Sequence, residues 1–428
     1  MGPIMAGGGW RDTIRNLRTF TSFKNPVYRL YYGAMMGQMA AMSMQMFARS
    51  LLLYRLTGSG AILGGMAVAN AIPMLLLSLF GGVIADRVQK KYVVLIGHMG
   101  SAVVCLGVAL TLTLGYLSRE HTLSILGIVF DSWWILIAAS VCQGAIMGLI
   151  MPSREAIIRE IVTTEQLLNA VSLNTMGMNA LRLFAPWATG RVIDNLGFAA
   201  VYYAMTGMYL VAAVFMAFLP RTSRITTDGG SPLEGIKAGF RYLRRETTIL
   251  SVLMFVLFGI VLSMSYTQLM PIFCLKILDV GATGMGDLMA VSGIGAVVGS
   301  LTLASLPNKK RGLILLGCGL LLSLTLVGFS FSDSWNVSLT FIVFVGLGQA
   351  GLMTLAGTLI QYYVDPKYLG RVMSILMMQF GLMSFGAFAT GLLTDIIGVQ
   401  WAVGGFAMIF AMLSMLALAF VPRIRNLE

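Results

Sequence analysis

Arg182 is the side chain in this sequence whose type and position most directly suggest binding chemistry. It lies about halfway along an apolar stretch at 167–193, with Asn179 three residues earlier. A charged side chain at the centre of a bilayer costs about 2.5–3.5 kcal/mol on insertion scales, so it should face a cavity or a partner. Arg182 is therefore predicted either to recognise an anionic ligand in a central cavity or to clamp two helices together.

A second group of polar side chains lies in the first long apolar stretch, at 30–55. Gln38, Gln45 and Arg49 are spaced by seven and four residues. At 100° per residue of helix, they fall within about 40° of one another on one face. This stripe is predicted to line a pathway, although Arg49 lies near the end of the stretch and could instead extend its charge to the interface.

Other polar residues stand singly in apolar stretches, where each either lines a cavity or cross-links two helices. These are Gln143, Tyr266, Gln349 and Gln379. No Asp or Glu lies near the middle of any predicted span, so a proton carrier would be His98 or one of the carboxylates near the span ends. His98 is more simply explained as a packed polar residue.

The composition places these residues in an integral membrane protein. The chain has 428 residues, of which 57% are hydrophobic and 11% are charged, with a mean hydropathy of +0.85. Those values exclude a soluble protein, and the apolar stretches are too long and too uniform for a β-barrel. The fold class is therefore all-α. The net charge of +12 is spread over connectors without aromatic interleaving, so no nucleic acid partner is predicted.

Twelve membrane spans are predicted from the apolar stretches. Most of the 29 Lys and Arg residues lie before the first span, on the even-numbered connectors and at the end. By the positive-inside rule, both termini are cytoplasmic. The predicted spans are 30–55, 60–85, 92–117, 132–153, 167–193, 198–219, 249–274, 283–306, 312–331, 335–363, 369–395 and 399–421.

A long polar connector divides these spans into six and six. The predicted division is an N-terminal half at 1–220, a cytoplasmic linker with a basic amphipathic helix at 221–247, and a C-terminal half at 248–428. A repeat supports it: Gly190-x-x-x-Asp194-x-x-Gly197 recurs as Gly391-x-x-x-Asp395-x-x-Gly398. Two related halves that hold a ligand near the bilayer midplane are typical of secondary transporters.

A charged turn follows the second predicted span. Its sequence, GVIADRVQKK, places Gly82, Asp86, Arg87, Lys90 and Lys91 in the pattern G-x-x-x-D-R-x-G-R-K/R. The pattern resembles the first intracellular loop of the major facilitator superfamily. The resemblance implies that Asp86 contacts the start of the eleventh span, near Pro366–Arg371, and closes the cytoplasmic side. Gln89 replaces the glycine of the pattern.

Further segments are similar to the enterobactin-exporter-like branch of that superfamily, which also contains drug-efflux proteins. They include FKNPVYRLYYG before the first span, MPSREAIIREIV after the fourth and YLGRVMSI into the eleventh. Two family patterns are altered. Ser140 stands where an Arg linked to proton coupling would precede Gln143, and the antiporter pattern of span five survives only as Ala185 to Gly190.

The resulting hypothesis is a secondary active transporter in an inner or plasma membrane, which exports amphipathic small molecules, drug-like compounds or a siderophore, by alternating access. No cofactor, metal or enzymatic activity is predicted. The predicted partners are the substrate, membrane lipid and a proton or other coupling ion, and the protein is expected to be monomeric. A membrane-embedded lipid-modifying enzyme and a non-transporting receptor on the same scaffold are the alternatives.

Overall fold

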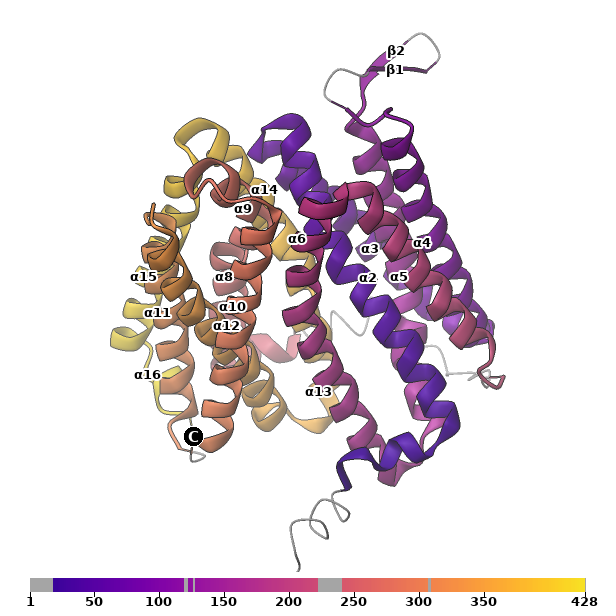
Figure 1. The fold of residues 1–428 in the computed structure, drawn as a ribbon. Helices are drawn as coiled ribbons and strands as arrows, with labels where there is room; N and C mark the ends of the chain where they lie inside the picture. The colour runs from indigo at the N-terminus through magenta and orange to yellow at the C-terminus, as the bar shows by residue number, and fades with distance from the viewer. Residues whose placement is uncertain (1–17, 119–121, 126–127, 222–240, 307–308, 428) are drawn as a thin grey trace, which may run out of the picture.

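The computed structural model describes residues 18–118, 122–125, 128–221, 241–306 and 309–427. These residues form a bundle of long helices with one small hairpin (Figure 1). Nine described helices are long and apolar enough to cross a membrane. The first long helix is not among them because Gln38, Gln45 and several weakly apolar residues interrupt its apolar surface.

The N-terminal half begins with a short 3₁₀ helix, η1, at Arg18–Lys24. Asn25 caps the helix that follows, since its side chain accepts hydrogen bonds from the backbone N–H groups of Val27 and Tyr28. The half then contains α2 (Pro26–Thr57), α3 (Gly60–Arg87), α4 (Lys90–Thr113), α5 (Trp134–Ile161) and α6 (Thr164–Ala217).

Helix α6 contains both the fifth and the sixth predicted spans. The two arms meet at Gly197, whose φ of 80° and ψ of 174° are not helical. A positive φ is readily adopted by glycine and strained for other residues. The predicted boundary between 193 and 198 is therefore a sharp reversal of direction without an intervening loop.

The C-terminal half contains two spans that are broken where the sequence predicted continuous helices. The predicted span 249–274 is divided into α8, α9 and the π-helical turn η2; Pro271 lies in α9 and cannot donate a hydrogen bond to the preceding turn. The predicted span 369–395 is divided at Met378, where the N–H groups of Met378 and Gly381 bond three residues back and tighten the turn.

The bounds of the elements in this half are α8 (Thr247–Ser263), α9 (Tyr266–Ile272), η2 (Phe273–Ile277), α10 (Ala282–Ser305), α11 (Arg311–Ser330), α12 (Trp335–Tyr363), α13 (Pro366–Met377), α14 (Gln379–Ile397), α15 (Val399–Phe420) and α16 (Pro422–Arg425). Most of the predicted linker at 221–247, including the start of its amphipathic helix, lies outside the described residues. Residues 241–245 are helical.

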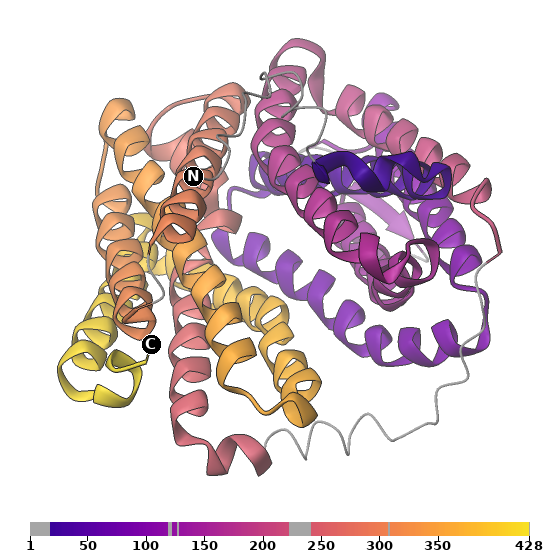
Figure 2. The same cartoon turned by 90° about the horizontal axis from the view of Figure 1, so that it is seen from below.

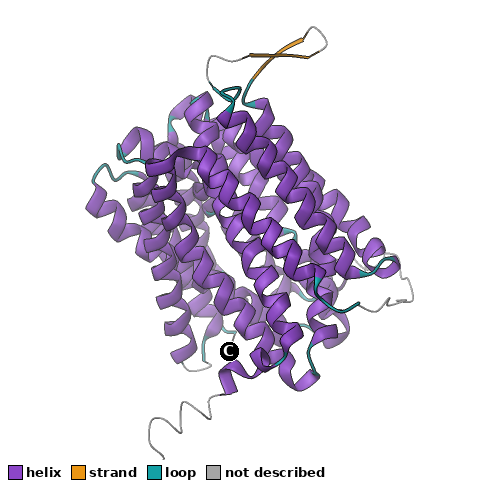
Figure 3. Ribbon diagram, turned by 45° about the vertical axis from the view of Figure 1, so that its right-hand side comes forward, coloured by secondary structure: helices purple, strands orange, loops and turns teal. Residues whose placement is uncertain are grey.

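An antiparallel hairpin joins α4 to α5. Strand β1 (Thr122–Ile125) pairs with β2 (Ile128–Asp131), and Thr122 lies opposite Asp131. The hairpin is a short connector and leaves the all-α fold class unchanged. Four of its eight strand residues, Thr122, Ile125, Ile128 and Val129, are β-branched and favour strands. It marks one end of the bundle, called the hairpin end below; the C-terminus lies toward the other, the terminal end (Figures 1 and 3).

The hydrophobic core is shared between the halves at the hairpin end and divided at the terminal end. One core cluster contains Leu51, Leu63 and Tyr202 of the N-terminal half together with Phe273 and Val399 of the C-terminal half. A second cluster fills the terminal end of the N-terminal half and consists of described residues of that half alone. Seen from below, the two halves stand as separate groups of helices (Figure 2).

Candidate functional site

Arg182 lies at the seam between the halves, next to two other polar residues singled out in the sequence. Its guanidinium interacts electrostatically with the hydroxyl of Tyr266 on α9. That hydroxyl donates a hydrogen bond to Gln349 Oε1 on α12 at 3.3 Å, and Ser292 of α10 is a further partner. We call Arg182, Tyr266, Ser292 and Gln349 the seam cluster.

Helix packing beside the cluster independently places α6 against α10. A Cβ atom built on Gly293 would lie 3.0 Å from Leu183 Cδ1, so the two helices touch one residue beyond Ser292 and Arg182. The Tyr266 side chain is buried, whereas that of Arg182 is exposed. The cluster thus combines the hydrogen-bonded pair Tyr266–Gln349 of the C-terminal half with the accessible guanidinium of Arg182 in the N-terminal half.

This arrangement can bind an anionic group of an amphipathic ligand. A guanidinium offers up to five N–H donors in a planar fork that matches a carboxylate or similar anion. The amide of Gln349 and the hydroxyl of Ser292 add polar contacts, and the Tyr266 ring provides an apolar surface. Because the cation and its neighbours belong to different halves, a relative motion of the halves would change the site.

The remaining residues predicted for the pathway lie on several helices of both halves. Asn179 is exposed on α6, and Gln379 is buried directly after the break between α13 and α14. Gln45 is buried on α2. Gln38 is also buried and donates from Nε2 to Met147 Sδ on α5 at 3.7 Å. Their role in a pathway stays a prediction.

Arg49 and Gln143 point into the N-terminal half. The guanidinium of Arg49 is close to the hydroxyls of Tyr202 and Tyr209 on α6. Gln143 Nε2 donates to Tyr209 Oη at 3.3 Å and to Ser101 Oγ on α4 at 3.2 Å. These two residues therefore join helices within one half, at a different place from the seam cluster.

The loop motif is only partly described. The backbone of α3 is helical to Arg87, but the side chains of Gly82, Asp86 and Arg87 lie outside the described residues. Lys90 Nζ is 2.6 Å from Glu160 Oε1 at the end of α5, and Lys91 donates to the Leu219 carbonyl after α6. Both lysines are buried and tie the terminal ends of α4, α5 and α6 together.

At the hairpin end, Asp395 caps the start of a helix in the other half. Its carboxylate accepts hydrogen bonds from Ser59 Oγ at 2.6 Å, Gly60 N at 2.7 Å and Ala61 N at 3.1 Å. Helix N-termini favour negative charge because their first N–H groups have no intrahelical acceptor. We call this contact between α14 and α3 the Asp395 latch.

The equivalent aspartate of the N-terminal half makes the reciprocal contact. Asp194 accepts from Thr283 N at 2.7 Å, at the start of α10 in the C-terminal half. Arg55 NH2 is 3.9 Å from the same carboxylate. Nearby, Arg191 NH1 and Asp287 Oδ1 form an ion pair between the halves at 2.9 Å. We call the contact between Asp194 and α10 the Asp194 latch.

The sequence revealed the aspartates of both latches through the repeat but not the helices that they cap. The missing partners begin at Ser59-Gly60-Ala61 and Gly281-Ala282-Thr283, two short runs of small residues just before apolar spans. These small residues at predicted helix starts were the sequence signal that could have identified the helices capped by Asp194 and Asp395. Ser292 of the seam cluster carried no comparable signal.

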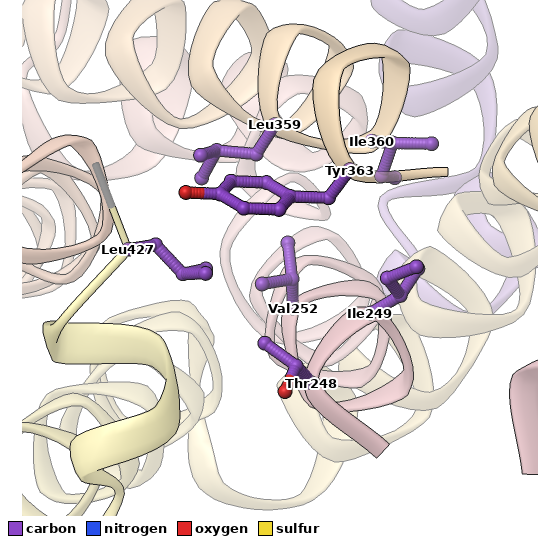
Figure 4. Close-up of a pocket in the computed structure, with 7 residues that line it drawn as sticks. All are labelled: Thr248, Ile249, Val252, Leu359, Ile360, Tyr363 and Leu427. Atoms are coloured by element: carbon purple, nitrogen blue, oxygen red, sulfur yellow. The ribbon is translucent and has the colours of Figure 1, made fainter. Parts of the chain in front are cut away.

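Two apolar hollows lie elsewhere in the C-terminal half and contain none of the predicted substrate residues. One, of about 10 Å³ and so about the size of one water molecule, lies between α8 and α12 and is lined by Val252, Leu359, Tyr363 and Leu427 among others (Figure 4). The other, of about 380 Å³, follows α8 and α15 and is lined mainly by Phe and Leu. Neither offers the charge that the seam cluster offers.

Two helical halves joined around a polar seam define a multi-pass membrane protein of the transporter class. The chain belongs to the Major Facilitator Superfamily, whose family model matches residues 31–385 and again 276–427. The family and the curated relatives are transporters and not enzymes, which confirms the predictions of family and of no enzymatic activity.

The relatives are distant but match over most of their length. The chain is 25% identical to the uncharacterized MFS-type transporter YfiS of Bacillus subtilis over 82% of this chain and 83% of that protein. It is 23% identical to the staphyloferrin A transporter of Staphylococcus aureus, over 79% and 82% of the two chains. It is also 23% identical to the enterobactin exporter EntS of Shigella boydii, over 81% and 80%.

Solved structures support the fold. A bacterial homologue of the human lysosomal transporter Spinster, in an inward-facing and unoccupied conformation, superposes with a TM-score of 0.70 at 13% identity, over 94% of this chain and 97% of that one. A D-xylose–proton symporter gives a TM-score of 0.71 at 12% identity, over 95% and 99%. At these identities the similarity concerns the fold alone.

Proposed function

We propose that this transporter exports amphipathic small molecules, a siderophore or drug-like compounds, by alternating access, and that it prefers those with an anionic group. The observation that carries the proposal is the seam cluster, where the accessible guanidinium of Arg182 lies within electrostatic range of Tyr266, which is hydrogen-bonded to Gln349 of the same half. The curated names of two relatives, a staphyloferrin A transporter and an enterobactin exporter, support a siderophore.

The proposed orientation places the terminal end in the cytoplasm of a cell whose inner or plasma membrane contains the protein. The basic connectors gather at that end, as the positive-inside rule requires. In this orientation the shared core and both latches close the outer side, and the seam cluster is reached from the cytoplasm. An exporter would load its substrate in this state, and we propose that it works as a monomer in the lipid.

The test replaces Arg182 by Gln and by Lys in proteoliposomes containing the purified full-length chain. We expect Arg182→Gln to reduce efflux of anionic amphiphiles at least tenfold, because a lost charge-assisted hydrogen bond is worth about 1.5–3 kcal/mol. Efflux of cationic amphiphiles of similar size should change much less. Arg182→Lys should recover part of the anion flux, since it keeps the charge without the planar fork.

Arg159→Gln is the matched control. Arg159 is exposed at the terminal end of α5, so this substitution removes the same charge away from the interface between the halves. Equal loss of anionic and cationic flux in Arg182→Gln would instead assign Arg182 to a structural clamp and contradict the proposal. The coupling species, a proton or another ion, can be identified in the same vesicles by imposing the pH gradient and the membrane potential separately.

A further inference from the structure

Arg49 is a partly buried cation without a counter-ion among its described neighbours. Its Nε and NH1 atoms are buried and have no hydrogen-bond partner among the described residues. The groups closest to it electrostatically are the hydroxyls of Tyr202 and Tyr209 and the thiol of Cys105 on α4. None of these three is a carboxylate, so nothing on the described part of the chain neutralises this guanidinium.

Other polar atoms around Arg49 are also unsatisfied. The hydroxyl of Tyr202 has no partner among the described residues, although its side chain is only 1% exposed. Gln143 donates to Tyr209 but its own Oε1 lacks a donor. Buried polar groups in proteins are normally paired with protein, ordered water or an ion. We call Arg49, Cys105, Gln143, Tyr202 and Tyr209 the Arg49 cluster.

The positive charge of Arg49 determines which kind of ligand could satisfy the cluster. An arginine keeps its proton in proteins, so burial cannot neutralise it. Water can satisfy its N–H groups but leaves the positive charge uncompensated inside an apolar half, where an unpaired ion is costly. The free donors in the cluster, two on Arg49 and one on Tyr202, are those that coordinate an anion.

The surroundings restrict the size of that anion. Cys105 and Tyr209 are fully buried, and Gln143 is 4% exposed. The cluster lies within the N-terminal half, between α2, α4, α5 and α6, and not at the seam through which a substrate would move. A drug-sized molecule cannot enter such a position without separating the helices, whereas a monatomic ion can.

We propose that the Arg49 cluster binds a small monovalent anion, chloride in the cell, as a resident counter-ion of the N-terminal half. The anion joins α2 to α6 by accepting from Arg49 and Tyr202. This role is separate from substrate recognition at Arg182, which is exposed and faces the other half. It also gives Arg49 a role different from the pathway lining predicted from its spacing with Gln38 and Gln45.

The test measures the melting temperature of the purified full-length protein in detergent at constant ionic strength, with chloride replaced stepwise by gluconate. We expect a saturable rise of several degrees with chloride, and a similar rise with bromide, because gluconate is too large for the buried position. Arg49→Gln should abolish this dependence. Arg182→Gln is the matched control and should keep it.

Tyr202→Phe provides a second variant in case Arg49→Gln does not fold. It removes one donor with little change of volume, and should raise the chloride concentration at half effect several-fold. A wild-type melting temperature that is identical in chloride and gluconate would show that the cluster holds water only and would overturn the proposal. An unchanged chloride dependence in Arg49→Gln, or in Tyr202→Phe where Arg49→Gln does not fold, would also overturn it.

Discussion

The two latches at the hairpin end come from the same sequence repeat but differ in the charged groups that surround them. Asp395 accepts three hydrogen bonds of 3.1 Å or less, all from uncharged donors at Ser59 to Ala61. Asp194 also accepts from three donors, namely Thr283 N at 2.7 Å, the Thr283 hydroxyl and Ala282 N, but the cation of Arg55 lies 3.9 Å away. The repeat therefore keeps both the direction of the contact, from each half to a helix start in the other, and the capping pattern, while the neighbouring charges differ.

The difference indicates how each seam is held. The α3–α14 contact joins the Asp395 carboxylate to uncharged donors. The α6–α10 contact also includes cations, among them Arg191 in its ion pair with Asp287, whose side chains are both partly exposed. Exposed ion pairs contribute about 0.2–1 kcal/mol and weaken in salt. Closure of the hairpin end should thus depend on ionic strength more through the contact between α6 and α10 than through the contact between α3 and α14.

The largest effect is expected from the glycines beside the latches. A Cβ atom on Gly391 would lie 2.3 Å from the Gly60 carbonyl oxygen, and one on Gly190 would lie 2.3 Å from that of Ala282. Both contacts are with backbone atoms that cannot turn aside. Gly391→Ala or Gly190→Ala should weaken the closed hairpin end by about 1–3 kcal/mol, which is about a 5- to 150-fold change in the ratio of open to closed.

Pulsed electron spin resonance can measure this ratio between labels at Leu196 and Ile396, which are 70% and 78% exposed at the hairpin end. The control is Gly405→Ala or Gly207→Ala, where an added Cβ would contact nothing within 4 Å. If Gly391→Ala and Gly190→Ala left the distance distribution as in these controls, the close approach of the two seams would not determine closure.

The aspartates themselves should give a smaller and unequal effect. Loss of a helix-capping side chain costs about 0.5–2 kcal/mol; we expect Asp395→Ala at the upper end of this range and Asp194→Ala at the lower. The reason is that Arg191–Asp287 still joins α6 to α10 when Asp194 is removed. The same labelled protein measures both, and added salt should open the Asp395→Ala variant further, because only the charged seam then remains.

Asp333→Ala is the control for this pair of variants, because Asp333 lies at the hairpin end but bonds to Gln400 of its own half at 2.9 Å. The comparison fails if Asp194→Ala opens the hairpin end more than Asp395→Ala does. That outcome would mean that the charged contacts between α6 and α10 hold the closure and that the Asp395 cap is secondary.

The latches also show what the sequence could and could not predict. Apolar length was sufficient for the helical membrane fold, because a bilayer imposes it. The count of twelve spans and the cytoplasmic position of the termini stay predictions. The repeat at Asp194 and Asp395 indicated two related halves. It did not identify the capped helices, since a contact between halves depends on how they are docked and not on spacing along one helix.

For the candidate site, too, the sequence predicted the individual residues but not how they come together. Arg182, Tyr266 and Gln349 were chosen singly because polar groups are costly in a span, and the fold brings them together from α6, α9 and α12. Arg49 shared one predicted face with Gln38 and Gln45, but periodicity alone does not say which neighbour a helix face meets. Its position inside one half required the packing of α6 against both α2 and α4.

The smallest expected effect comes from the terminal end. It favours opening of that end, whereas the variants above favour opening of the hairpin end. We propose that Asp86 caps the start of α13 when the terminal end closes, as the latches do at the hairpin end. A carboxylate at a helix N-terminus contributes about 0.3–1 kcal/mol, so Asp86→Asn should modestly favour the state that is open at the terminal end and slow transport. The labels for this measurement are Leu168 and Tyr362, which are 79% and 71% exposed.

Asp365→Asn distinguishes a closing contact from an ordinary cap. Asp365 already accepts from Lys367 N at 2.9 Å within its own half, so its loss should destabilise α13 equally in both states and leave the distance distribution unchanged. Asp86→Asn should shift that distribution while the protein remains folded and inserted. Wild-type transport rates and distances in Asp86→Asn would mean that the hairpin-end latches alone set the balance between the two states.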